Sequence, residues 1–132
     1  MPRCRCHSRK QEKRCCGPFH AGRPAPTPLA LMRSRYSAFA KGLVDYVIAT
    51  TDPDGPQWEP DRNAWRASLQ ATCRATRYTG LDILEAPPSD GDTGEVTFRA
   101  HLSVAGQDRT FVERSAFRRI GERWHYVGPL PR

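Results

Sequence analysis

A regular alternation of apolar and polar side chains in the second half of the chain restricts the folds that this sequence can adopt. It runs through residues 95–104, EVTFRAHLSV, whose apolar positions are Val96, Phe98, Ala100, Leu102 and Val104. A period of two is typical of a strand with one buried face. AGQD at 105–108 fits a hairpin into a second long strand through about residue 120, with a third strand at 124–127 and an earlier one at 81–86. We therefore expect an antiparallel sheet.

The first half of the chain has helical spacing instead. Thr27 followed by Pro28 fits an N-cap and a first helical residue. The apolar face of this helix consists of Leu29, Met32, Tyr36 and Phe39. A short second helix over 44–48 and, after a loop at 51–60, a third helix capped by Asp61 are expected to follow. Helices followed by an antiparallel sheet predict an α+β domain.

Four of the five cysteines lie within residues 4–17, CRCHSRKQEKRCCG, at Cys4, Cys6, Cys15 and Cys16. Two close pairs joined by a short loop can supply the four soft ligands of a tetrahedral zinc site, and nearby Lys and Arg favour the thiolate forms. Free or redox-active thiols and a disulfide are the alternatives. We expect Cys73 to take no part because it is distant in the chain, and His7 and His20 to be surface or loop residues rather than ligands.

The net charge of +7 is concentrated at the N-terminus. Residues 1–23 carry a balance of +6, whereas residues 24–132 are nearly neutral. The basic patch consists of Arg3, Arg5, Arg9, Lys10, Lys13 and Arg14. It predicts an acidic partner, either an acidic protein face or RNA contacted at its phosphates. No Phe, Tyr or Trp lies between Arg3 and Cys16 to stack on bases.

The start of the chain, MPRCRCHSRK, has no apolar segment typical of a signal peptide. No window approaches the roughly 18 apolar residues of a membrane-spanning helix. We therefore expect a cytoplasmic protein without a membrane span, in a reducing compartment where clustered cysteines favour metal or redox chemistry over disulfides.

The cysteines, with CCGPFHAGRPAPTPLALMRSRYSAFAKG at 15–42 and VERSAFRRIGERWHYVGP at 112–129, resemble the YchJ-like family. This family has a SEC-C zinc motif ahead of a domain similar to nuclear transport factor 2. The resemblance implies that the four cysteines bind zinc, that residues 1–23 form a small tip, and that residues 24–132 form a cone in which a curved sheet wraps around helices. Dimers are common in this fold. One departure is that His7, Ser8 and Arg9 replace the family's usual Gly-Ser-Gly turn.

The interior of such a cone would hold any small-molecule site. On the second long strand one face carries Phe111, Glu113, Ser115 and Phe117, and its two aromatic residues indicate that it is buried. Because an inward carboxylate needs a partner, we expect a structural ion pair between Glu113 and Arg33 or Arg35. The other candidates for the interior are Tyr36, Trp65 and Trp124.

Two functions of different classes are consistent with these features. The first is a zinc-binding cytoplasmic adaptor whose basic tip contacts an acidic partner. The second is a small-molecule-binding protein or enzyme that uses the cone, an inference from the fold alone. We favour the adaptor over an enzyme because the sequence contains no recognisable catalytic motif. A filled cone with Glu113 bonded to arginine would support the first function, and an open cavity without that pair the second.

Overall fold

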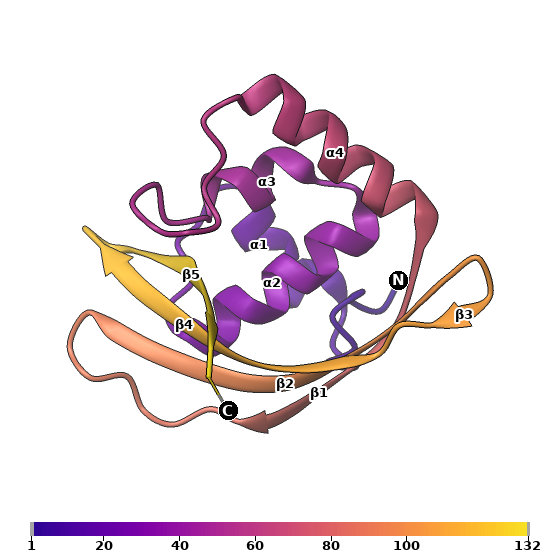
Figure 1. Cartoon of the computed structure of the whole chain (residues 1–132). Coiled ribbons are helices and arrows are strands. Elements are labelled where there is room, and N and C mark those ends of the chain that lie inside the picture. Colours follow the sequence, from indigo (N-terminus) through magenta and orange to yellow (C-terminus); the bar gives the residue numbers. More distant parts are fainter. Residues whose placement is uncertain (1, 132) are drawn as a thin grey trace.

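In a computed structural model of the chain, which describes residues 2–131, helices lie against the concave face of a curved antiparallel sheet (Figure 1). The strands are β1 (Thr76–Glu85), β2 (Thr93–Val104), β3 (Gln107–Asp108), β4 (Phe111–Ile120) and β5 (Arg123–Leu130). The sheet order is β1-β2-β4-β5, and β3 pairs only with the end of β2. The predicted α+β architecture is confirmed. β1 begins earlier than the predicted residue 81, because the chain passes directly from a helix into the strand-favouring residues Thr76 and Tyr78.

The three predicted helices are present as α2 (Pro28–Lys41), α3 (Val44–Ala49) and α4 (Arg62–Ala75). Thr27 and Asp61 cap α2 and α4, each accepting the backbone N–H of the third residue along at 3.0 Å. Two short helices in the tip, η1 (Glu12–Arg14) and α1 (Gly17–His20), were not predicted. None of the helices in residues 2–131 is long and apolar enough to cross a membrane.

The hydrophobic core lies between α2 and the concave face of the sheet. The alternating side chains of β2 confirm the predicted face, since Val96, Phe98 and Ala100 are all buried. They pack with residues of α2 and of the later strands, namely Leu31, Met32, Tyr36, Phe117 and Trp124. α2 is therefore the central helix of the domain, and its polar side chains project to either side of this core.

Tyr36 closes a bulge in β1. The register between β1 and β2 shifts between Tyr78 and Gly80, which locally disrupts the ladder of backbone hydrogen bonds. The Tyr36 hydroxyl donates to the carbonyl of His101 at 3.0 Å and accepts from the N–H of Gly80 at 3.1 Å. One side chain of the central helix thus joins two strands at their irregular point.

We expect Tyr36→Phe to lower the free energy of unfolding by about 1 kcal/mol, because the backbone groups of Gly80 and His101, which are half-buried, lose their partner. Denaturant unfolding measures the change. Tyr78→Phe is the control, since no backbone group of the described residues bonds to the Tyr78 hydroxyl. Equal stability of the two variants would show that the Tyr36 hydroxyl does not support the bulge.

The segment after α3 is fastened to the sheet by an ion pair between a buried carboxylate and a partly exposed arginine, which the sequence did not reveal. Thr51 forms a bridge with Tyr126 of β5. The next residue, Asp52, is 3% exposed, and both of its carboxylate oxygens accept hydrogen bonds of 2.8 Å from Arg118 of β4. These bonds hold the pKa of Asp52 below its usual value in spite of the burial. The predicted loop at 51–60 is therefore anchored at its start.

We expect Asp52→Asn to cost about 1–2 kcal/mol of stability at neutral pH, since it removes a charge-assisted bidentate pair. Because the pKa of Asp52 is lowered on folding, the pair stabilises the protein above the unfolded pKa of about 3.9 and is lost as the pH falls through the folded pKa. The variant should therefore lose less stability than the wild type below about pH 4. Asp54→Asn is the control, because Asp54 is 85% exposed and should contribute little. If the free energies of unfolding of the wild type and of Asp52→Asn fell in parallel as the pH was lowered, the ion pair would not have this stabilising role.

Candidate metal centre and cone cavity

The tip brings the four predicted cysteines together. The sulfur atoms of Cys4, Cys6, Cys15 and Cys16 all lie within 4.8 Å of one another. The sulfur of Cys15 is 3.5 Å from that of Cys6 and 3.9 Å from that of Cys16. Cys73 lies in the last turn of α4 and is not part of the cluster.

The cluster has the dimensions of a four-thiolate metal site. A tetrahedron with metal–sulfur bonds of about 2.3 Å has sulfur–sulfur edges of about 3.8 Å. The two sulfur–sulfur contacts of 3.5 and 3.9 Å lie on either side of this value. Hydrogen bonds from Cys16 and Cys4 lower the pKa of Cys6, whereas hydrogen bonding with Cys4 and Cys6, together with burial, raises the pKa of Cys16. The donor set and spacing thus fit a soft metal ion, whose binding would release the remaining thiol protons.

The loop between the cysteine pairs contains two residues other than glycine in the left-handed conformation that glycine usually adopts. His7 has a φ of 63° and Arg9 a φ of 72°, in the left-handed region that non-glycine residues seldom adopt. These are the two positions at which the family's usual turn has glycine. Ser8 lies between them, and its hydroxyl is 3.1 Å from the sulfur of Cys15. The turn is therefore retained at a cost of about 1–2 kcal/mol for each strained residue.

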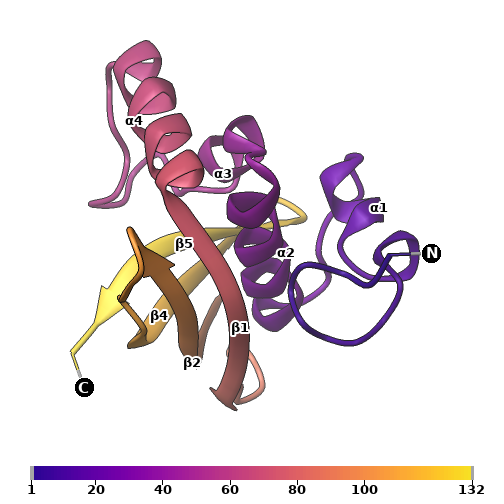
Figure 2. The same cartoon turned by 90° about the vertical axis from the view of Figure 1, so that its right-hand side faces the viewer.

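Arg33 contacts the cysteine cluster and does not line the cone. The N-terminal segment of the tip lies beside α2 (Figure 2). Arg33 of α2 donates from its Nη1 to the backbone carbonyl of Cys6 at 3.3 Å. The expected pairing of Arg33 with Glu113 is therefore wrong. A positive charge beside Cys6 is suited to the negative charge of a four-thiolate centre.

The two histidines considered as ligands lie outside the cluster. His20 is half-buried, with its Nε2 2.8 Å from the carbonyl of Ser34 and its ring against Tyr46. Burial lowers the pKa of His20, so it is a neutral packing residue at physiological pH. His7 is exposed, and its ring centroid lies 6.0 Å from that of Tyr36. Both histidines thus contribute to docking the tip against the central helix.

The basic patch lies in the same segment as the cysteine cluster and is exposed on the surface of the tip. All six of its side chains are exposed, and none forms an ion pair with a described residue. Among the described residues of the tip, only Glu12 forms an ion pair, with Lys41 of α2. The patch residues are therefore free to contact another molecule.

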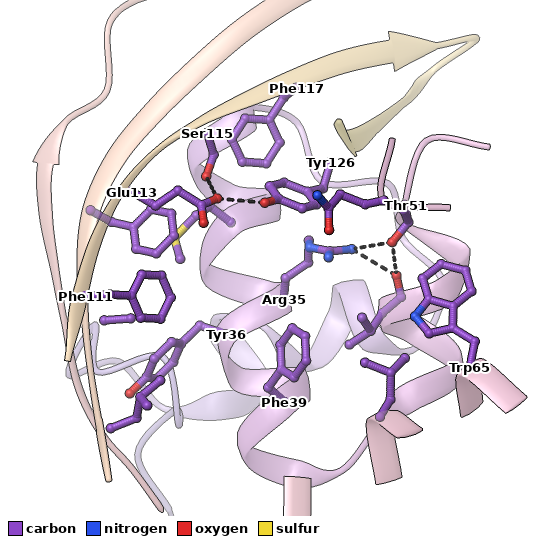
Figure 3. Close-up of a pocket in the computed structure, with 17 residues that line it drawn as sticks. Arg35, Tyr36, Phe39, Thr51, Trp65, Phe111, Glu113, Ser115, Phe117 and Tyr126 are labelled. Atoms are coloured by element: carbon purple, nitrogen blue, oxygen red, sulfur yellow. Dashed lines mark hydrogen bonds between the residues drawn. The ribbon is translucent and has the colours of Figure 1, made fainter. Parts of the chain in front are cut away.

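A cavity of about 280 Å³ lies between α2, α4 and the concave face of the sheet (Figure 3). Its lining includes four of the predicted interior residues, Arg35, Tyr36, Trp65 and Glu113. Trp124 is instead 3% exposed in the core and does not line this cavity. Thr51 and Tyr126 line it as well, brought there by their bridge. The cone is open inside, and the half-exposed ring of Phe111 lies at its edge.

The expected ion pair between Glu113 and Arg35 is also wrong. Glu113 Oε2 accepts hydrogen bonds from Ser115 Oγ at 2.5 Å and Tyr126 OH at 2.7 Å. No arginine of the described residues is within ion-pair distance of Glu113. Glu113 is thus bonded to a hydroxyl of its own strand and to one of the neighbouring strand β5. The contact with Tyr126 depends on the register of β4 and β5, which the sequence does not reveal.

Arg35 is held by α3 and the segment that follows it. Its Nη1 donates to the carbonyl of Val47 at 2.9 Å and to the hydroxyls of Thr50 and Thr51 at 2.7 and 3.2 Å. The guanidinium carbon lies 4.6 Å from the ring centroid of Tyr126. Burial lowers the pKa of Arg35 to about 10, so the side chain is still a cation at pH 7. Burial and the bond to Glu113 raise the pKa of Tyr126, which remains a donor.

The sequence profile for the middle nuclear transport factor 2-like domain of YchJ matches residues 27–129. The chain belongs to the YchJ-like family. Its curated relatives include a UPF0225 protein of Pectobacterium carotovorum, 43% identical over 130 residues that span 94% of this chain and 80% of the relative. Another, from Deinococcus radiodurans, is 42% identical over 126 residues that span 94% of this chain and 85% of the relative.

Solved structures have the same fold as this YchJ-like protein. A SEC-C motif containing protein of Rhodopseudomonas palustris is 32% identical with a TM-score of 0.81, covering 99% of both chains. A second SEC-C motif containing protein, from Psychrobacter arcticus, has a TM-score of 0.79 at 22% identity and covers 100% of this chain and 84% of its own. At that identity the likeness shows the fold alone.

In this YchJ-like chain α2 joins the two candidate sites. Arg33 and Arg35 are two residues apart and project to different sides of the helix, one to the cysteine cluster and one to the cavity. The spacing in "MRSRYSAF" already places the two arginines on different faces. The partners of the two arginines, however, depend on how the tip and the sheet pack against α2.

Proposed function

We propose that the cone binds a small organic molecule and that a zinc ion bound by Cys4, Cys6, Cys15 and Cys16 holds the tip together. The observation that carries the first part is the open cavity in which Glu113 and Arg35 are not bonded to each other. The cavity volume of about 280 Å³ is just below the range of about 300–1,000 Å³ that is typical of ligand pockets. A cavity of this size suits a compound with one ring. Apolar walls with a few fixed polar groups are the usual composition of such sites.

Nuclear magnetic resonance with a library of single-ring fragments tests the cone. We expect fragments to shift the backbone amide signals of cavity residues such as Phe98, Glu113 and Tyr126. Ala100→Leu is the matched variant, because Ala100 lines the cavity and is 2% exposed, so a larger side chain there reduces the space. A library that shifts no cavity signal, or shifts that persist unchanged in Ala100→Leu, would contradict binding in the cone.

Zinc is supported by the ligand set. Four cysteine ligands leave no position for a substrate, which is typical of structural rather than catalytic zinc. The SEC-C description of the Rhodopseudomonas palustris protein agrees with such a tip in residues 1–23 ahead of a domain in residues 24–132. Zinc bound to reduced thiols also fits the cytoplasm, where cysteines stay reduced.

An adaptor role for the basic patch is the second candidate, favoured by six exposed cations without ion-pair partners. It predicts a salt-sensitive contact with an acidic protein or with RNA phosphates. Replacing Arg9, Lys10, Lys13 and Arg14 by Ser should abolish retention on an acidic-protein or RNA column at about 50 mM salt.

The control carries the same loss of charge on the body, with Arg62, Arg74, Arg77 and Arg109 replaced by Ser. Equal retention of the two variants would contradict a specific role for the tip. Zinc content should be measured in both, because a loss of zinc in the tip variant with unchanged retention would show that the charges serve the metal.

A further inference from the structure

Two charged side chains face the cone cavity with hydrogen-bonding atoms that the protein does not use. All three hydrogen bonds of Arg35 to described residues come from Nη1, so Nε and Nη2 donate to none of them. Both bonds accepted by Glu113 are at Oε2, so Oε1 accepts none. No buried side-chain nitrogen or oxygen of residues 2–131 lacks a partner. These unused atoms are therefore reached from the cavity (Figure 3).

Tyr126 keeps the two charges apart and oriented. Its ring lies against the guanidinium of Arg35, and its hydroxyl donates to the carboxylate of Glu113. Val47 and Thr50 fix the other side of the guanidinium, and Ser115 fixes the carboxylate. The polar groups are thus positioned before any ligand binds, which removes much of the ordering cost of binding.

Opposite charges beside one cavity select the charge of its ligand. An anion would be attracted by Arg35 and repelled by Glu113, and a cation would experience the reverse. A neutral group that both accepts and donates hydrogen bonds can satisfy both side chains. The rest of the lining supplies apolar surface for a small ring through Phe39, Trp65, Phe98, Phe111 and Phe117.

We propose that the cone binds a neutral compound with a single-ring apolar body and an amide head. The amide oxygen accepts a hydrogen bond from Arg35, and the amide N–H donates to Glu113 Oε1. This assignment rests on the cone being a ligand site, as proposed above.

Three probes with the same body separate the effect of the head from that of the ring. They are 3-phenylpropionamide, 3-phenylpropionate and 3-phenylpropylammonium, titrated into zinc-loaded full-length protein and followed through the amide signals of cavity residues. We expect the amide to bind at least about tenfold more tightly than either ion, because each ion meets one like charge in a partly dehydrated site.

Variants then assign the head group. Glu113→Gln removes the negative charge while keeping the shape of the side chain. The affinity of the carboxylate probe relative to that of the amide probe should therefore increase by about tenfold. Phe111→Leu at the edge of the cavity is the control, and it should weaken all three probes alike. If Glu113→Gln does not fold, the order of the three probes in the wild type still decides the proposal.

The outcomes distinguish this ligand class from the general function of the cone. Equal affinities for the three probes would overturn the amide assignment and leave the cone as an apolar binding site. Tightest binding of either ion would also overturn it, because one charge would then dominate. If the fragment library shifts cavity signals and the amide does not, only the ligand class fails; if neither shifts them, both proposals fail.

Discussion

Purified without chelator, the protein should contain one zinc ion per chain, and Cys6→Ser should lose it. The four sulfur atoms lie within 4.8 Å of one another, and Cys6 is fully buried among them, so its replacement removes a central ligand. Apart from Phe19, which packs against the main core, the buried apolar residues of the tip are the cysteines themselves, so we expect metal binding to supply most of its folding free energy. In small zinc-dependent folds this amounts to about 10–16 kcal/mol. Metal analysis with thiol alkylation and mass spectrometry measures both occupancy and ligand protection.

Cys73→Ser is the matched control and should retain full occupancy, because Cys73 lies in α4 outside the cluster. In Cys6→Ser the tip should become sensitive to proteases while the body of the protein keeps its melting transition. Less than about half an equivalent of zinc, with all four thiols freely alkylated, would contradict the site. Native mass spectrometry of the same sample also reports the subunit count and so tests for the homodimer that is common in this fold.

The elements that local chemistry specifies were predictable from sequence. The alternation in β2 and the caps at Thr27 and Asp61 depend on side chains close together in the chain, and the structure confirms them. The cysteine cluster was predictable for the same reason, since the loop between the two pairs is short.

The partners of the interior charges were not predictable, because they depend on register and packing between distant segments. Glu113 meets Tyr126 only because β4 and β5 pair through a shift between Ala116 and Phe117. Arg35 meets the carbonyl of Val47 only because α3 folds back onto α2. The pair between Asp52 and Arg118 joins residues 66 positions apart in the chain. Charge alone therefore predicted that Glu113 needed partners but assigned the wrong ones.

We also expect the strained turn in the tip to limit the affinity for zinc. His7 and Arg9 both have positive φ values, although neither is glycine. A left-handed conformation costs a residue with a Cβ about 1–2 kcal/mol, and glycine avoids this cost at the expense of about 0.5–1 kcal/mol of extra entropy in the unfolded chain. In a tip whose folding is coupled to metal binding, relief of strain increases the metal affinity.

We therefore expect the double variant His7→Gly and Arg9→Gly to bind zinc about tenfold more tightly than the wild type, since about 1.4 kcal/mol of net strain relief corresponds to that factor. Competition with a chromophoric chelator measures the affinity. The double variant His7→Ala and Arg9→Ala is the control, because alanine removes the same side chains, including the ring of His7 against Tyr36, but keeps the Cβ atoms and thus the strain. Only the glycine variant should gain affinity. Equal affinities of the glycine and alanine variants would show that the left-handed turn costs the metal site nothing.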